Sequence, residues 1–133
     1  MTTFSNPEGV AAPIGQYSHV ARIDLGDVAL LFISGQVALG PDGMLVGTGD
    51  AATQAARIFE NLKTIMEANG GALADIVKLT TFVTNMDDRA SLSEVRRRYF
   101  GDAAPASTLV EITRLASDDM LVEIEAVGVV PNA

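Results

Sequence analysis

The strongest local pattern in the chain is a helical stripe of apolar residues with a clear start and a clear stop. Asp50 belongs to the residue types that cap helix N-termini, and Gly70-Gly71 after Asn69 supplies a left-handed stop. Between these signals, apolar residues recur at the spacing of one helix face. They are Ala55, Ile58, Phe59, Leu62, Ile65 and Met66. We therefore predict a helix over residues 50–69 that buries this face in a core.

Strand-like segments lie on both sides of this helix, and a second helical segment lies between them. The apolar, β-branched or alternating segments cover residues 20–23, 28–34, 76–83, 107–113 and 120–130. The first two flank Gly26-Asp27, which predicts a hairpin. A second helix begins near residues 85–88, where carboxylates suit the positive helix end, and runs to about Phe100. Residues 1–15 carry many helix and strand breakers, so we expect a loop there.

The order hairpin, helix, strand, helix, strand, strand predicts an α+β fold. In it, both helices pack on one face of a mixed sheet. With 133 residues the chain is expected to form a single domain over residues 1–133, because two halves would each be too small to bury a core. The other face of the sheet would need cover, which subunit association could provide.

Charge and residue usage exclude several classes of function. The net charge of −8 disfavours nucleic-acid binding, and the basic run Arg96-Arg97-Arg98 is more simply a solvated helix face. No apolar run approaches 18 residues, so no membrane span is expected. With no cysteine and no signal-like start, we expect a cytoplasmic protein without disulfides or thiolate metal sites.

Cofactors and metals are not indicated either. His19 is the only histidine, which excludes a histidine metal cluster and is more typical of a surface side chain or of one whose hydrogen bonds are satisfied within the protein. No GxGxxG or GxxxxGK[ST] motif is present, so a nucleotide cofactor is not expected.

Two glutamates in the last strand are the best candidates for chemistry. Glu123 and Glu125 are two residues apart, so both emerge on one sheet face, with the apolar Leu121, Val127 and Val129. Apolar neighbours would desolvate a carboxylate and raise its pKa toward the range of general acid–base catalysis. The alternative is an edge strand whose acids face water.

Gly35 is a second candidate. It lies near the end of a strand, where the backbone can approach a ligand closely, although a role in a turn is equally compatible with the sequence.

Several segments, taken in chain order, resemble the signature of one family. They are Ile14-Gly15-Gln16-Tyr17-Ser18, Ile33-Ser34-Gly35-Gln36, Asn61-Leu62 with Ala68-Asn69-Gly70, residues 75–83, Pro105-Ala106 and residues 122–127. Each motif is modest alone, but together they cover nearly the whole chain. The sequence thus resembles the RidA/YjgF family of reactive-intermediate deaminases.

This resemblance implies a chorismate-mutase-like homotrimer with small-molecule clefts between subunits. Members of the family hydrolyse reactive enamines and imines, such as 2-aminoacrylate, to a ketoacid and ammonia without metal or cofactor. By resemblance, Glu123 would position the attacking water, while Tyr17 and the backbone near Gly35 would line the cleft.

The chain departs from the family where the substrate carboxylate is held. Active deaminases carry an arginine after "PA", whereas this chain has Ser107, which cannot replace that charge. In the second helix, the family's cleft phenylalanine and asparagine are replaced by Arg89 and Ser93. These two are four residues apart, hence on one helix face, and Arg96 follows one turn later.

The role of Arg89 has two interpretations. Our hypothesis is that Arg89 supplies from the helix the cation that the strand has lost, for a repositioned or larger substrate. The alternative is a solvated first-turn residue paired with Asp87 or Asp88.

The leading functional prediction is hydrolysis of an imine or enamine, with specificity set by Arg89, Ser93 and Ser107. The alternative is a non-catalytic trimer that binds a small ligand or acts as a chaperone-like accessory protein. Retention of Glu123 favours the enzyme, and loss of the family arginine favours the binding protein. The family's older labels of endoribonuclease and translation inhibitor fit less well with the negative charge and the single histidine.

Overall fold

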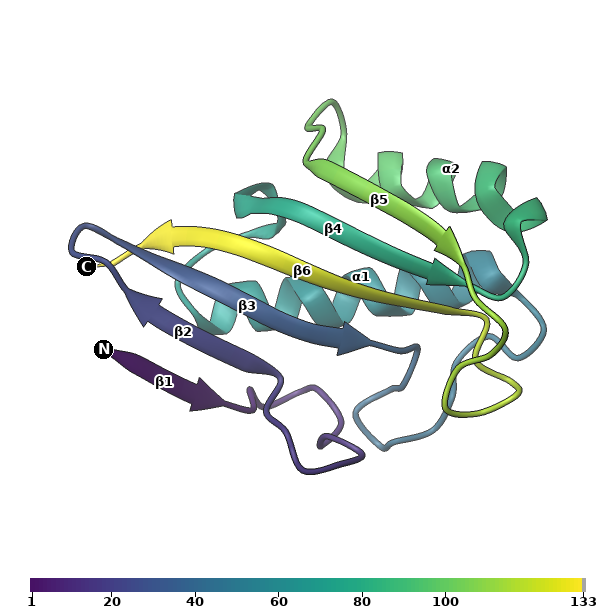
Figure 1. Cartoon of the computed structure of the whole chain (residues 1–133), viewed down its shortest axis with the longest axis horizontal. Coiled ribbons are helices and arrows are strands. Elements are labelled where there is room, and N and C mark those ends of the chain that lie inside the picture. The colour runs from purple at the N-terminus through teal and green to yellow at the C-terminus, as the bar shows by residue number, and fades with distance from the viewer. Residues whose placement is uncertain (133) are drawn as a thin grey trace.

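The described residues, 1–132 of a computed structural model, form one six-stranded sheet with two helices on one of its faces (Figure 1). The strands are β1 (Thr2–Ser5), β2 (Val20–Asp24), β3 (Val28–Gln36), β4 (Ile76–Val83), β5 (Ala106–Glu111) and β6 (Val122–Pro131). The helices are α1 (Ala51–Ala68) and α2 (Arg89–Phe100). A short 3₁₀ helix, η1 (Leu73–Asp75), leads into β4, and another, η2 (Met86–Asp88), leads into α2. The predicted α+β class is confirmed, and residue 133 of the expected domain lies outside the described residues.

The strand order is β1-β2-β3-β6-β4-β5. Only β4 and β5 run parallel; the other neighbours are antiparallel, so the sheet is mixed. Because β6 lies between β3 and β4, the suggestion that its glutamates stand on an edge strand is wrong. Its side chains alternate as predicted: Val122, Ile124 and Ala126 are buried toward the helices, and Glu123 and Glu125 emerge on the helix-free face, which we call the open face.

Helix α1 forms for the reasons given by the sequence. The Asp50 side chain accepts hydrogen bonds from the Thr53 hydroxyl, at 2.7 Å, and from the Thr53 backbone N–H, and these two bonds lower the pKa of the carboxyl. The helix ends before Gly70, whose φ of +83° is a conformation that favours glycine. Every residue of the predicted apolar stripe is at most 3% exposed, so the predicted face is confirmed.

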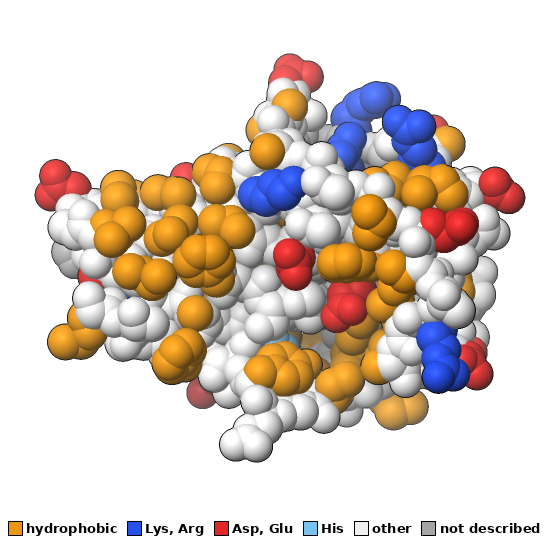
Figure 2. Space-filling model, viewed as in Figure 1, with side chains coloured by type: hydrophobic (Ala, Val, Ile, Leu, Met, Phe, Trp, Pro, Cys, Tyr) orange, Lys and Arg blue, Asp and Glu red, His pale blue; other side chains and the backbone are white. Residues whose placement is uncertain are grey.

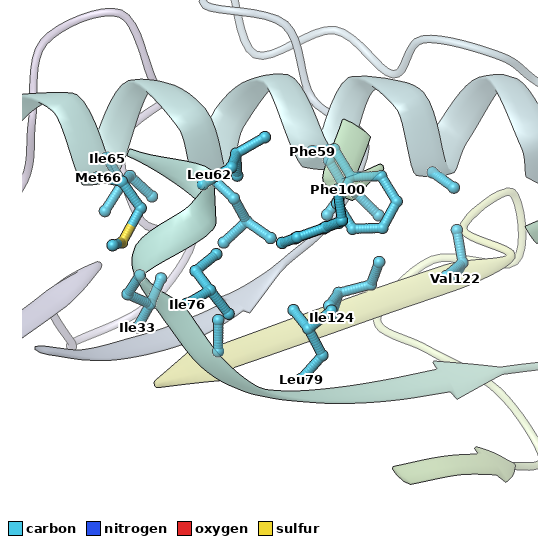
Figure 3. Close-up of a cluster of buried hydrophobic side chains, with 14 of the residues drawn as sticks. Ile33, Phe59, Leu62, Ile65, Met66, Ile76, Leu79, Phe100, Val122 and Ile124 are labelled. Atoms are coloured by element: carbon cyan, nitrogen blue, oxygen red, sulfur yellow. The ribbon is translucent and has the colours of Figure 1, made fainter. Parts of the chain in front are cut away.

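The core lies between the two helices and the inner face of the sheet. Figure 3 shows Phe59 and Leu62 of α1 pointing toward Leu79 of β4 and Ile124 of β6. Phe100 at the end of α2 meets Phe59 edge to face, with ring centroids 5.5 Å apart. These contacts fix α2 beside the β4–β5 half of the sheet, which positions the second group of candidate residues described below.

The N-terminal segment is the main correction. Residues 1–15 were expected to be a loop, but Thr2–Ser5 pair antiparallel with β2 as an edge strand. All four side chains are exposed, so the strand depends on its partner's backbone and shows no local apolar pattern. The residues that disfavour strands begin only after β1, at Asn6-Pro7.

The ends of the last two strands differ by one or two residues from those predicted. The sequence predicted 107–113 and 120–130, and the strands cover Ala106–Glu111 and Val122–Pro131.

Candidate functional site

Glu123 is held on the open face directly over Gly35. Between Ile33 and Gln36, strand β3 contains one residue more than the facing stretch of β6, which is a bulge. A β-carbon built at position 35 would lie 2.5 Å from Glu123 Oε2 and 2.8 Å from its Cδ. The glycine therefore makes room for the Glu123 carboxylate. The close approach of a ligand to Gly35 stays a prediction.

The surroundings of Glu123 raise its pKa. Partial burial among the side chains of the open face is the larger cause, because it disfavours the charged form, and the neighbouring Glu125 carboxylate is the second. The strand alternation predicted the first cause, desolvation, whereas the effect of the Glu125 charge was not predicted. A carboxylate with a raised pKa is a better proton acceptor at neutral pH than an ordinary surface glutamate.

Tyr17 is 45% exposed and lies near Gly35, over which the Glu123 carboxylate is held. It lines a narrow hollow with Gly35 and Gln36, and also a wider hollow of about 490 Å³ with Ser34, Phe32 and other residues of the open face. Glu125, rather than Glu123, lines the wider hollow. We call Tyr17, Gly35 and Glu123 the Glu123 group.

A buried histidine anchors the segment that carries Tyr17. His19 Nε2 lies 2.6 Å from the carbonyl oxygen of Ala11, which can only accept, so this nitrogen carries the hydrogen. His19 Nδ1 then accepts from the Gln36 side-chain amide at 3.0 Å. The Ser34 hydroxyl donates to the carbonyl oxygen of Ser18 at 2.7 Å. The expectation of a satisfied structural histidine is confirmed, and these contacts tie the Tyr17 segment to the end of β3.

The other predicted residues lie on the opposite side of the sheet. Arg89, Ser93 and Ser107 line a groove between α2 and β5, of about 470 Å³, together with Met86, Arg96 and Leu109. We call it the α2–β5 groove. Glu123 of β6 pairs with Phe82 of β4, which in turn pairs with Val110 of β5. Val110 therefore lies on the same face of the sheet as Glu123, and Ser107, three residues before Val110, lies on the other face. Within one chain the structure thus brings Arg89, Ser93 and Ser107 together, but not with Glu123.

Arg96 makes the contact that the sequence did not single out. Its Nη1 donates to Ser107 Oγ at 3.3 Å, so the guanidinium reaches the strand position where the resemblance expects an arginine. Arg89 faces the same groove, and among residues 1–132 the one ion pair joins Arg22 to Asp24. Arg89 is exposed, as the alternative interpretation expected, but it forms no ion pair with Asp87 or Asp88. Its role in holding a substrate stays a prediction.

Charged and apolar side chains are unevenly distributed over the molecule. Figure 2 views the open face: hydrophobic side chains gather most densely at the left, acidic side chains lie near the centre, and several basic side chains lie at the upper right, near α2. Within the described residues, no three histidine or carboxylate side chains gather as a metal site. Over the same residues, neither helix has the length and apolar character needed to cross a membrane.

Comparisons with known proteins agree with the motif pattern. A family model described as "Endoribonuclease L-PSP" matches residues 9–130. A RutC family protein from Pyrococcus horikoshii is 40% identical over 121 residues, which cover 91% of this chain and 92% of the relative. A 2-iminobutanoate/2-iminopropanoate deaminase from Escherichia coli is 37% identical over 125 residues, covering 92% and 93%. The crystal structure of E. coli TdcF with bound serine superposes with a TM-score of 0.82 at 30% identity, covering 98% and 99% of the two chains.

Proposed function

Since this chain belongs to the endoribonuclease L-PSP family, also called the YjgF/RidA family, we propose that it hydrolyses a reactive imine or enamine to a carbonyl compound and ammonia. The observation that carries the proposal is the Glu123 carboxylate, held over Gly35 on the open face with a raised pKa. The likeness to a named imine deaminase supports the reaction class.

The chemistry requires one proton acceptor and no redox partner. Glu123 takes one proton from water as the water oxygen adds to the C=N carbon and returns it to nitrogen, which gives a neutral tetrahedral aminoalcohol, R₂C(OH)NH₂. Glu123 then carries the remaining hydroxyl proton to the same nitrogen, so the C–N bond breaks, NH₃ leaves and the C=O bond forms. Overall, R₂C=NH and H₂O give R₂C=O and NH₃. Tyr17 and the backbone near Gly35 orient the substrate beside the carboxylate.

The complete site needs more than one copy of the chain. The Glu123 group and the α2–β5 groove lie on opposite faces of one sheet, so a single small substrate cannot contact both in one subunit. The exposed apolar residues of the open face, such as Phe4 and Phe32, support its burial against another copy. The proposal is a closed homotrimer in which the Glu123 group of one subunit meets the groove of the next.

The test is ammonia release from freshly generated 2-aminoacrylate and from a panel of bulkier and uncharged imines. We expect acceleration over buffer by the native protein and a loss of about 100-fold or more in Glu123→Gln, the usual contribution of a general base. Glu8→Gln, a change of the same type at a distant exposed residue, is the matched control. If neither the native protein nor the control accelerates hydrolysis of any imine, the proposal is overturned.

A ligand-binding function without catalysis is the second candidate. It is favoured by one observation, the serine at position 107 where the resemblance expects the carboxylate-binding arginine. The bound serine in TdcF shows that a protein of this fold can hold a small molecule. Binding of imines or their products with no ammonia release above buffer would favour this function.

A further inference from the structure

We propose that the α2–β5 groove selects a substrate with two carboxylates, through Arg96 together with Ser107 at one end and Arg89 at the other. The inference rests on the proposed function and deepens it, because it names the class of imine. Binding of the substrate carboxylate, which the resemblance expects of an arginine at position 107, is assigned instead to Arg96, which reaches Ser107 from α2.

The helix places three polar side chains along the groove. Arg89, Ser93 and Arg96 are spaced by four and three residues, so they share one face of α2. Seven residues of helix advance about 10 Å, so the two arginines stand two turns apart with Ser93 between them. Such a pair suits two separated anionic groups better than one compact anion.

The two arginines are available for a ligand. Arg96 donates one N–H to the neutral Ser107 hydroxyl, which leaves its other donors free for a carboxylate. The Ser107 hydroxyl accepts that bond and keeps its own hydrogen to donate to the same ligand. Within residues 1–132 neither Arg89 nor Arg96 has a carboxylate within salt-bridge distance, although the chain carries 17 aspartates and glutamates.

Apolar side chains form the floor below these cations. A narrow extension of the groove, about 40 Å³, reaches down to the core side chains Phe59, Leu92 and Ile124. The methylene carbons of a short dicarboxylate would lie over this floor, with its charged ends on the rim. Arg96 also lines a neighbouring hollow of about 360 Å³, together with Arg97 and Asp102. The carboxylate of Asp102 offsets one of the two cations there, whereas the groove between Arg89 and Arg96 has two cations and no acid in its lining.

The spacing of the two arginines and the apolar floor between them favour a 2-imino dicarboxylate as the substrate that is hydrolysed. A 2-imino dicarboxylate of four or five carbons and water would give the 2-oxo dicarboxylate and ammonia. The planar guanidinium fork matches a carboxylate in a bidentate arrangement, which gives both affinity and orientation. The imine carbon would then be presented to the Glu123 group of the adjoining subunit.

The first experiment measures binding without chemistry. Calorimetry compares 2-oxoglutarate with 2-oxopentanoate, which has the same chain length and one carboxylate fewer. The native protein should bind 2-oxoglutarate at least 10-fold more tightly. Arg96→Gln and Arg89→Gln should each weaken 2-oxoglutarate binding about 10- to 100-fold, the usual effect of losing a charged hydrogen-bonding partner. Arg98→Gln removes the same charge from the same helix outside the groove and should change it little.

The second experiment measures turnover of the matching imines. An amino-acid oxidase with catalase generates 2-iminoglutarate from glutamate and 2-iminopentanoate from norvaline, and semicarbazide captures the imine that escapes hydrolysis. We expect kcat/KM to favour 2-iminoglutarate at least 10-fold, and Arg96→Gln to remove that preference. Arg96→Lys should restore only part of it, because lysine keeps the charge without the fork.

The outcomes separate this inference from the proposed function. Hydrolysis of both imines that requires Glu123 but shows no preference, or equal losses in Arg98→Gln and Arg96→Gln, overturns the inference and leaves the function standing. Selective binding of 2-oxoglutarate that depends on Arg96, with no hydrolysis of any imine, overturns the function and leaves a dicarboxylate-binding groove. Equal affinity for the two oxo acids in the native protein overturns the dicarboxylate assignment directly.

Discussion

The carboxylate of Glu123 occupies the space that a side chain at position 35 would need: a β-carbon there would lie 2.5 Å from Oε2. Gly35→Ala must therefore turn the carboxylate away or shift β3 against β6. We expect kcat/KM for imine hydrolysis to fall at least 10-fold, because a small misplacement of a catalytic group is costly. Gly40→Ala is the control, since its added carbon would lie 3.1 Å from the Asp42 carboxylate and otherwise make only ordinary contacts, at 3.8 Å, with Met44 and Val46. Equal kcat/KM in the two variants would contradict the role given to Gly35.

The two glutamates of β6 should be visible in the pH profile. Burial and then Glu125 raise the pKa of Glu123, and only the ionised form accepts a proton from water. Activity should fall as pH decreases through this raised pKa. Glu125→Gln removes one cause of the shift, so the acid limb of kcat/KM should move to lower pH. If the acid limb of kcat/KM lies at the same pH in Glu125→Gln and in the native protein, Glu125 does not raise the pKa of the group that controls activity.

The elements of this fold were largely predictable because their signals are local. The α1 stripe and its cap lie within 20 residues of sequence, and strand alternation places Glu123 on a face regardless of its partners. Strand β4 has the predicted bounds, 76–83. Strand β1 carries no such signal, since its exposed side chains give no pattern and its pairing depends on β2, 15 or more residues away.

The site was predictable only in part, because its geometry depends on how distant segments dock. The separation of Glu123 from Ser107 follows from the register of β6, β4 and β5, which no local pattern fixes. The contact of Arg96 with Ser107 depends on the placement of α2 against an edge strand. The i, i+4, i+7 spacing of the helix was the one available signal for Arg96.

Gln54 is a buried residue of α1 that the sequence did not mark and that fixes the start of β6. It is 0% exposed; its amide nitrogen donates to the carbonyl oxygens of Gly47 and Asp119, and its oxygen accepts from the Leu121 N–H at 2.9 Å. Gln54→Leu removes the side-chain partner of the Asp119 carbonyl and of the Leu121 N–H, while the Gly47 carbonyl keeps the hydrogen bond from the Asp50 N–H at 2.9 Å. We expect a loss of about 3 kcal/mol in the free energy of unfolding by urea denaturation. Gln16→Leu, at an exposed residue, should lower the free energy of unfolding by less than 1 kcal/mol. An equal loss in Gln16→Leu and Gln54→Leu would contradict the role given to the hydrogen bonds of Gln54.

The open face is the surface that should govern assembly. Phe4, Ala21, Phe32 and Val127 follow one another across β1, β2, β3 and β6 in register, and Phe32 is 46% exposed in the single chain. A charge placed at Phe32 would be buried without a partner if this row is an interface, which is strongly unfavourable. Sedimentation velocity should therefore show a trimer for the native protein and monomers for Phe32→Glu at equal concentration.

Activity and assembly should then fail together. Because the Glu123 group and the α2–β5 groove lie on opposite faces of one sheet, a folded monomer has both half-sites but cannot bring them to one substrate. Phe32→Glu should therefore lose imine hydrolysis while its circular dichroism stays native. Met44→Glu adds the same charge at a residue that is 67% exposed in a loop, and should remain an active trimer. A monomeric native protein, or an active monomeric Phe32→Glu, would show instead that one chain holds the whole site.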